Sequence, residues 1–353
     1  MKNINIDNLV CAHIKNMHAY SSARLEYDGK QAIFLDANEN SLGSVTNTLH
    51  NRYPDPLQYD IKVALAHIEH LNTDQIFLGN GSDECIDVLV RCFCNSSKDE
   101  ILICPPVFPM YEHAANVHHV KINEINLLPE IFQLDIDKII TEVEQNKQLK
   151  IIFICTPNNP TGNSINKNDI QLLLQKFDGL IVIDEAYQDF SDKESCLSML
   201  NEYQNLVVIK TFSKAWGMAD ARLGMLYAHQ DIISFMNVIK MPYNVNQHSQ
   251  NLAIEALHNV DKKKEYVNIL NNNRTYLLTE MSKINWIQKI FSTDANFILF
   301  RVEDANKAYK YLLDNGIVVR NRDKAPLLKG CLRVSIGTQA ENEKFIEALK
   351  KYV

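Results

Sequence analysis

A lysine follows a buried-looking strand within TFSKAWGMADARLG, residues 211–224. Thr211, Ser213 and Lys214 come directly after the apolar run NLVVIK, and Arg222 comes eight positions after the lysine. A guanidinium binds phosphate in bidentate fashion, and the two hydroxyls can add donors. This spacing indicates a phosphate site with an amine beside it.

Three further polar side chains follow neighbouring apolar runs. Asp184 ends LIVID, Tyr187 follows in DEAYQDF, and Asn159 lies in PNNPTG after KIIFIC. The prolines of that turn fix φ and hold Asn159 rigidly. Ligands bind at the carboxyl ends of parallel strands, so an acid, a phenol, an amide and an amine would converge there. Taken singly, Asp184 reads equally well as a helix cap, Lys214 as a surface charge and NPTG as an ordinary turn.

The stretch IFLGNGSDECIDVLV predicts a strand, a glycine turn and a helix. The backbone N–H groups of Ser82 and Asp83 at that helix start form a ready anion site. A dinucleotide fingerprint would need glycine at position 84, where the chain has Glu84. A single phosphate group is therefore the better prediction than a dinucleotide.

A lysine beside a phosphate site, a carboxylate and a phenol is typical of pyridoxal phosphate chemistry. The amine forms a Schiff base with the cofactor, and the carboxylate keeps the pyridine nitrogen protonated. Once substrate displaces it, Lys214 becomes free to move the proton of the substrate's α-carbon. Lys214, Asp184 and Tyr187 are therefore the candidate catalytic residues.

These side chains need strands to position them. Apolar runs over 75–79, 100–104, 150–155, 180–184, 205–210 and 222–228 alternate with amphipathic helical patterns. Strands that are apolar throughout predict a mainly parallel α/β sheet covered on both faces. After residue 262 a long polar helix precedes strands and helices of α+β character. We expect an arm over 1–30, a large domain over 31–258 and a small domain over 259–353.

The bulk composition limits the partners. The chain has 353 residues, 46% of them hydrophobic, and a net charge of -7, so no basic surplus predicts nucleic acid or anionic lipid as a partner. No apolar run reaches the roughly 18 residues of a membrane span, and no signal-peptide core is evident. We expect a soluble, cytoplasmic protein. The eight cysteines form no C-x-x-C pair, so free thiols are expected and no metal site.

The ordered motifs PNNPTG, DEAY and TFSKAWGMADARLG resemble those of the fold-type I, class II aminotransferases. HAYSSARL, LDANEN, NRYPDP, GNGSDE, CPPVFPMY and CLRVSIGT make the chain from about residue 18 onward similar to the histidinol-phosphate aminotransferase family. This resemblance implies a seven-stranded sheet and a homodimer. It implies transamination of histidinol phosphate with 2-oxoglutarate, giving imidazole acetol phosphate and glutamate in histidine biosynthesis.

The resemblance also implies roles for single residues. Lys214 would bind pyridoxal phosphate, Asp184 its pyridine nitrogen, and Tyr187 with Asn159 its ring hydroxyl. The cofactor-binding set is completed by a stacking side chain, the phosphate ligands and one residue from the neighbouring subunit: Phe108, Ser82, Asp83, Thr211, Ser213, Arg222 and Tyr53.

Substrate binding would rest on Tyr20, Arg320 and Arg333. Arg333 would bind the phosphate of histidinol phosphate and, in the other half-reaction, a carboxylate of glutamate. Arg320 would be the second phosphate partner and Tyr20 would line the imidazole side, whereas Arg322 reads as part of a basic loop.

Several departures from the family pattern accompany the resemblance. Phe108 stands where tyrosine is frequent, and Asp220 adds a carboxylate near the phosphate site. The same cofactor residues also fit an aromatic amino acid aminotransferase or a phosphothreonine decarboxylase. A non-catalytic regulator that binds pyridoxal phosphate is a third alternative from a different class of protein.

Overall fold

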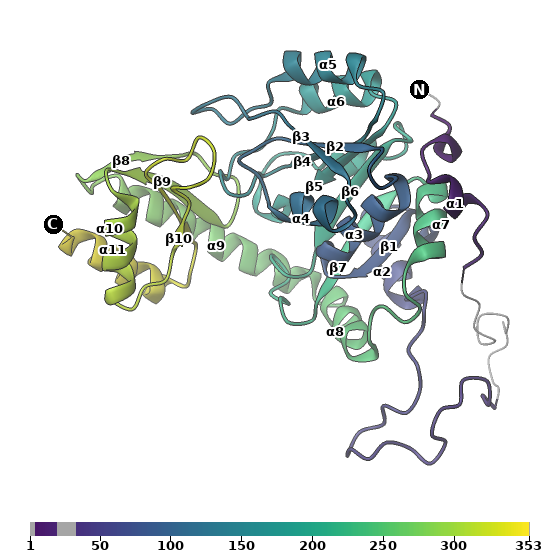
Figure 1. The fold of residues 1–353 in the computed structure, drawn as a ribbon. Helices are drawn as coiled ribbons and strands as arrows, with labels where there is room; N and C mark the ends of the chain where they lie inside the picture. The colour runs from purple at the N-terminus through teal and green to yellow at the C-terminus, as the bar shows by residue number, and fades with distance from the viewer. Residues whose placement is uncertain (1–3, 20–32, 353) are drawn as a thin grey trace.

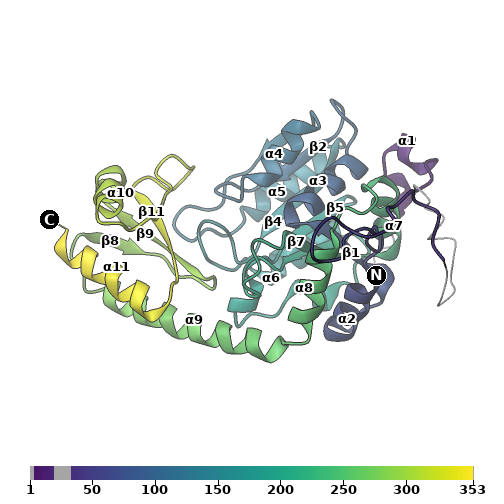
Figure 2. The same cartoon turned by 90° about the horizontal axis from the view of Figure 1, so that it is seen from below.

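The computed structural model describes residues 4–19 and 33–352 and contains two β-sheets. The larger sheet and its helices form one part of the molecule, and the smaller sheet forms the other (Figure 1). The long helix α9 (Val260–Met281) runs from beside α8 (Gln247–Leu257) to the smaller sheet, where α11 (Gln339–Lys351) packs along it (Figure 2). Tyr20 lies outside the described residues.

The larger sheet has seven strands in the order β1-β7-β6-β5-β4-β2-β3. Strands β2 to β6 pair in parallel, and β7 is antiparallel to both of its neighbours. The predicted mainly parallel α/β sheet is confirmed. Its strands are β1 (Ile76–Asn80), β2 (Glu100–Ile103), β3 (Lys121–Glu124), β4 (Leu149–Cys155), β5 (Leu180–Asp184), β6 (Leu206–Thr211) and β7 (Leu223–Ala228).

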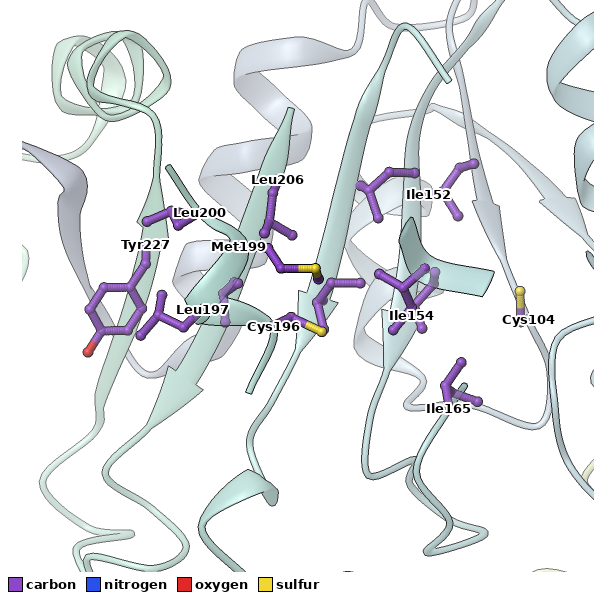
Figure 3. Close-up of a cluster of buried hydrophobic side chains, with 14 of the residues drawn as sticks. Cys104, Ile152, Ile154, Ile165, Cys196, Leu197, Met199, Leu200, Leu206 and Tyr227 are labelled. Atoms are coloured by element: carbon purple, nitrogen blue, oxygen red, sulfur yellow. The ribbon is translucent and has the colours of Figure 1, made fainter. Parts of the chain in front are cut away.

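Helices cover both faces of this sheet, which explains why its central strands are apolar throughout. Phe153 and Val182 point to one helical layer, whereas Ile152 and Ile183 point to the other. The first layer contains α3 (Ser82–Phe93), α4 (Met110–Val117) and α7 (Gln230–Ile239). The second contains α2 (Tyr59–Glu69), α5 (Ile136–Gln145), α6 (Lys167–Lys176) and α8. Figure 3 shows part of the core on the second side, including Ile152 and Ile154.

The smaller sheet is antiparallel, in the order β10-β11-β9-β8. Its strands are β8 (Ile287–Ile290), β9 (Phe297–Val302), β10 (Arg320–Asn321) and β11 (Cys331–Ser335). Leu332 and Val334 pack with α9, α10 (Ala305–Asp314) and α11, so the helices lie on one face. Gly316 turns the chain with a positive φ and Val318 is exposed, so the paired strand begins only at Arg320.

The described amino-terminal residues form η1 (Ile6–Asn8) and α1 (Ala12–Lys15), which pack beside α3 and α7. Residues 33–57 contain no helix or strand, and the first part of this segment extends away from the body of the molecule (Figure 1). Its last residues return to the body, where Tyr53 stacks on Tyr243 and the carbonyl of Pro56 accepts from Nζ of Lys240. Three short 3-10 helices, η3 (Thr73–Gln75), η4 (Gln188–Phe190) and η5 (Cys196–Met199), complete the fold. Within 4–19 and 33–352, no helix is both long and apolar enough to cross a membrane.

Candidate active site

A cavity of about 180 Å³ opens at the carboxyl ends of β4, β5 and β6. Asp184 ends β5, Thr211 ends β6, and Cys155 at the end of β4 is the register partner of Asp184. Parallel pairing therefore brings the side chains that follow these strands to one rim. Ten of the predicted cofactor residues line this cavity: Lys214, Asp184, Tyr187, Asn159, Ser82, Asp83, Phe108, Thr211, Ser213 and Arg222.

The anion-binding side of the cavity depends on two close backbone approaches. Gly81 has φ of +80°, and a Cβ there would lie 2.6 Å from Nη2 of Arg222. A Cβ on Gly224 would lie 2.2 Å from the backbone nitrogen of Ser82. Only glycine allows this packing, which places the start of α3 directly against Arg222 and β7.

Arg222 is oriented by two partners. Its Nη2 donates to Oδ2 of Asp83 at 3.2 Å, and its Nη1 donates to the carbonyl of Ala219 at 3.2 Å. Beside it, the Ser213 backbone nitrogen donates to Oγ1 of Thr211 at 3.1 Å. A helix start, a guanidinium and two hydroxyls thus surround one end of the cavity, which suits a phosphate group.

Asp184 is buried and accepts two hydrogen bonds. The hydroxyl of Tyr111 donates to its Oδ2 at 2.6 Å, and the backbone nitrogen of Ala186 donates to its Oδ1 at 3.0 Å. Burial raises the pKa of the Asp184 carboxyl, although the Tyr111 hydrogen bond opposes that rise. A buried carboxylate of this kind gains most from a cationic partner, such as a protonated ring nitrogen.

Tyr111 was missed by the sequence analysis. It lies on α4, is fully buried, and stacks on Phe153 with ring centroids 4.7 Å apart. Phe108 meets it edge to face at 5.8 Å. The motif CPPVFPMY contains both aromatic residues, but no strand end pointed to Tyr111 as a partner of Asp184.

Lys214 lies 5.5 Å from the ring centroid of Tyr187. Burial by the surrounding protein lowers the pKa of Lys214, and the positive charge of Arg333 lowers it further. A larger share of the amine is therefore neutral near pH 7 than for a solvated lysine, which suits a nucleophile or a base. Asn159 Nδ2 donates to the Tyr187 hydroxyl at 3.3 Å, and burial raises the pKa of that phenol.

The smaller sheet contributes to the same site. Arg333 of β11 donates to Oδ1 of Asn159, and its guanidinium carbon lies 5.0 Å from the ring centroid of Phe297. Phe297 in turn meets Tyr187 edge to face at 5.0 Å. Arg320 is the register partner of Arg333 on β10 and is exposed. The two predicted substrate arginines therefore lie side by side, and Arg333 contacts Asn159.

Two predicted features lie elsewhere. Tyr53 does not line the cavity of its own chain: it is half exposed and stacks on Tyr243 with ring centroids 4.5 Å apart. Asp220 is exposed, and among residues 4–19 and 33–352 it has no ion-pair partner. Ala219 and Arg222 line the cavity, whereas Asp220 does not.

Comparison with known proteins agrees with this geometry. Residues 25–349 match the family model of the class I and II aminotransferases. The chain is 46% identical to the histidinol-phosphate aminotransferase of Cytophaga hutchinsonii, over 98% of this chain and 99% of that protein. It is also 46% identical to the histidinol-phosphate aminotransferase of Flavobacterium johnsoniae, over 99% of each.

Solved structures show the same architecture. The histidinol-phosphate aminotransferase of Clostridium acetobutylicum has a TM-score of 0.77 at 29% identity, covering 85% of this chain and 90% of that one. The enzyme of Sinorhizobium meliloti in complex with pyridoxal-5'-phosphate has a TM-score of 0.78 at 23% identity, covering 85% and 82%.

The chain is therefore an aminotransferase of class I and II. Within that class it belongs to the histidinol-phosphate aminotransferase family, as the sequence motifs predicted. The predicted cofactor, pyridoxal phosphate, is confirmed by this membership. The donor set of the cavity fits the cofactor, because it offers an amine, a buried carboxylate, a phenol with an amide, and an anion site.

Proposed function

We propose that this chain transfers an amino group from histidinol phosphate to 2-oxoglutarate, giving imidazole acetol phosphate and glutamate in histidine biosynthesis. The observation that carries the proposal is the pairing of Arg320 with Arg333 beside the cavity. Two guanidinium groups on adjacent strands suit a substrate phosphate better than an uncharged aromatic ring. The names of the relatives at 46% identity support the same substrate.

In this proposal the residues that line the cavity contact different parts of the cofactor. Lys214 would hold it through its amine, Asp184 would face the ring nitrogen, and Tyr187 with Asn159 would face the ring hydroxyl. When bound, pyridoxal phosphate supplies an electron-withdrawing ring that stabilises the negative charge left when the substrate loses its α-proton. Phe108 would lie on the ring face. The phosphate would lie among Ser82, Asp83, Thr211, Ser213 and Arg222.

Lys214 would also move the proton. The lowered pKa of its amine leaves more of it neutral at the working pH, so Nζ could accept the proton from the substrate's α-carbon and give it up again in the following proton transfer. The phenol of Tyr187 remains protonated because burial raises its pKa, so it acts as a hydrogen-bond donor rather than a second base.

Arg333 would serve both half-reactions. Its bond to Asn159 orients the guanidinium toward the Tyr187 side of the cavity, where it would bind the phosphate of histidinol phosphate or a carboxylate of glutamate. The guanidinium of Arg320 would bind the same substrate phosphate as a second partner. Tyr20, outside the described residues, would line the imidazole side.

The decisive experiment compares amino donors. Rates with histidinol phosphate, phenylalanine, tyrosine and phosphothreonine should be measured side by side with 2-oxoglutarate as acceptor. The proposal predicts that histidinol phosphate has the highest kcat/KM, by about a hundredfold or more, because the aromatic amino acids leave Arg320 without an anion. Faster turnover of phenylalanine or tyrosine, or release of carbon dioxide from phosphothreonine, would instead support one of the alternative enzymes.

We also propose a homodimer in which Tyr53 reaches the cofactor phosphate of the neighbouring subunit. Residues 33–57 expose large apolar side chains, among them Leu42 at 98% and Val45 at 104% of full accessibility. A hollow of about 700 Å³ separates part of this segment from Tyr243 and the start of α8. A second subunit would cover both features, which a lone chain leaves open to water.

The proposed division of the chain follows the two sheets. It comprises an arm over 1–30, a large domain over 31–258 and a small domain over 259–353, and the two domains would meet at the start of α9. The proposed location is the cytoplasm, where 2-oxoglutarate and glutamate are available and the eight buried, unpaired cysteines would stay reduced.

A further inference from the structure

A third arginine lies beside the two predicted substrate arginines. Arg322 follows β10 directly, and its backbone nitrogen donates to the carbonyl of Cys331 at 2.9 Å, which extends the pairing of β10 with β11. Side chains alternate between the faces of such a ladder, so Arg320, Arg322 and Arg333 share one face. Leu332 and Val334 point to the opposite face, into the helices.

Arg322 has no acidic partner among the residues that the structure describes. The acid next to it, Asp323, accepts instead from the backbone nitrogen of Gly330 at 2.8 Å and from Nζ of Lys329 at 3.1 Å. Glu130, the acid near the far end of this sheet, binds Lys289 and Arg301. The Nε atoms of Arg322 and Arg333 are buried without a hydrogen-bond partner.

Like charges crowd this face. Burial, together with the positive charges of Arg333 and Arg320, lowers the pKa of Arg322 to about 10, although Tyr187 opposes the shift. Burial likewise lowers the pKa of Arg333. Three neighbouring guanidinium groups without a carboxylate between them are destabilising unless an anion joins them.

We propose that Arg322 is a specificity-determining residue that binds the substrate's phosphate together with Arg320 and Arg333. This inference rests on the proposed function, because it assigns the third cation to the phosphate end of the same substrate. A phosphate monoester carries nearly two negative charges and three acceptor oxygens, so three guanidinium groups can bind it at once. A carboxylate of glutamate has one charge and two oxygens, and Arg333 alone satisfies it.

The test compares Arg322→Met, which keeps the length of the side chain without its charge, with Arg322→Lys and with the control Lys324→Met. Lys324 is exposed in the same loop, so its loss removes an equal charge from the same region. Two quantities are measured on the holoenzyme: kcat/KM in each half-reaction, and the inhibition constant of inorganic phosphate against the glutamate half-reaction. With the cofactor bound, its own phosphate site is already filled.

Arg322→Met should weaken inhibition by phosphate about tenfold or more and lower kcat/KM for histidinol phosphate by a similar factor, mainly through KM. In Arg322→Met, kcat/KM for glutamate should change less than about threefold. Arg322→Lys should recover part of the loss in phosphate inhibition and in kcat/KM for histidinol phosphate, and Lys324→Met should match the wild type in both. An unchanged phosphate inhibition constant in Arg322→Met, no phosphate inhibition of the wild type, or an equal loss with glutamate overturns the inference. If the wild type does not turn over histidinol phosphate but phosphate inhibition still depends on Arg322, the proposed function fails and the anion site stands.

Discussion

The hydroxyl of Tyr111 donates a hydrogen bond of 2.6 Å to the buried carboxylate of Asp184. Among the residues that the structure describes, this carboxylate accepts one further hydrogen bond, from the backbone nitrogen of Ala186. Because the Tyr111 bond opposes the rise in the Asp184 pKa, it favours the charged form that a cationic cofactor nitrogen requires.

Tyr111→Phe should therefore weaken cofactor binding. The loss of a hydrogen bond to a charged group costs about 1.5–3 kcal/mol, so the dissociation constant of pyridoxal phosphate should rise about tenfold or more. Titration followed by absorbance measures this constant. Tyr227→Phe is the matched control, because Tyr227 is also fully buried but its hydroxyl donates to the uncharged sulfur of Met225, at 3.3 Å. Equal dissociation constants for Tyr111→Phe and the wild type would refute the role of Tyr111.

Asp184→Asn should flatten the pH dependence of stability in the cofactor-free protein. Burial raises the folded-state pKa of Asp184 above its ordinary value of 3.8, so the folded state holds the proton more tightly than the unfolded state. Stability from this group is fully present below pH 3.8 and is lost as the pH rises through the folded pKa. Thermal unfolding between pH 4 and pH 8 should show the wild type losing more stability than the variant. Parallel curves would contradict the assignment of this pKa shift.

Arg222→Gln should weaken cofactor binding only through the loss of contacts to the cofactor's phosphate. Arg222 is held by Asp83 and by the carbonyl of Ala219, so its charge is fixed near the start of α3. The affinity for pyridoxal phosphate should fall about tenfold or more, whereas the affinity for pyridoxal, which lacks the phosphate, should stay within about twofold. An equal loss for both ligands would mean that the substitution disturbs the cavity as a whole.

The variants Tyr53→Ala and Lys214→Ala should restore activity to each other when their subunits are mixed. A Tyr53→Ala subunit paired with a Lys214→Ala subunit has one site with both original residues, because Tyr53 would come from the partner. Random mixing of the two inactive variants should restore about a quarter of wild-type activity, since half of the dimers are hybrids with one intact site each. If the mixture stays as inactive as its components, Tyr53 serves its own subunit or neither site.

The sequence was most informative where apolar runs end in polar side chains. Asp184 and Thr211 end buried strands, and Lys214 follows three residues after Thr211, so parallel pairing alone predicted their convergence. The strand β3 has no comparable signal, because three of its four residues, KINE, are polar and all four are exposed or partly exposed at the edge of the sheet.

Contacts between segments far apart in the chain were harder to predict. Tyr111 reaches Asp184 from a helix 73 positions away, and no local pattern joins the two. Arg322 read as part of a loop because β10 has only two residues, too few to show the alternation that places it beside Arg333. Asp220 remained unexplained from the sequence, and its exposure outside the cavity removes the conflict with a bound phosphate.

The most direct test of the central claim, that Lys214 carries the cofactor in this cavity, is peptide mapping after borohydride reduction. Reduction fixes pyridoxal phosphate permanently to the amine that holds it, and mass spectrometry of the digest then identifies the lysine. Attachment to Lys214 predicts the added mass on the peptide that contains this residue, at close to one cofactor per chain, and none in Lys214→Ala. Cofactor fixed to another lysine, or the same labelling in Lys214→Ala, would contradict it.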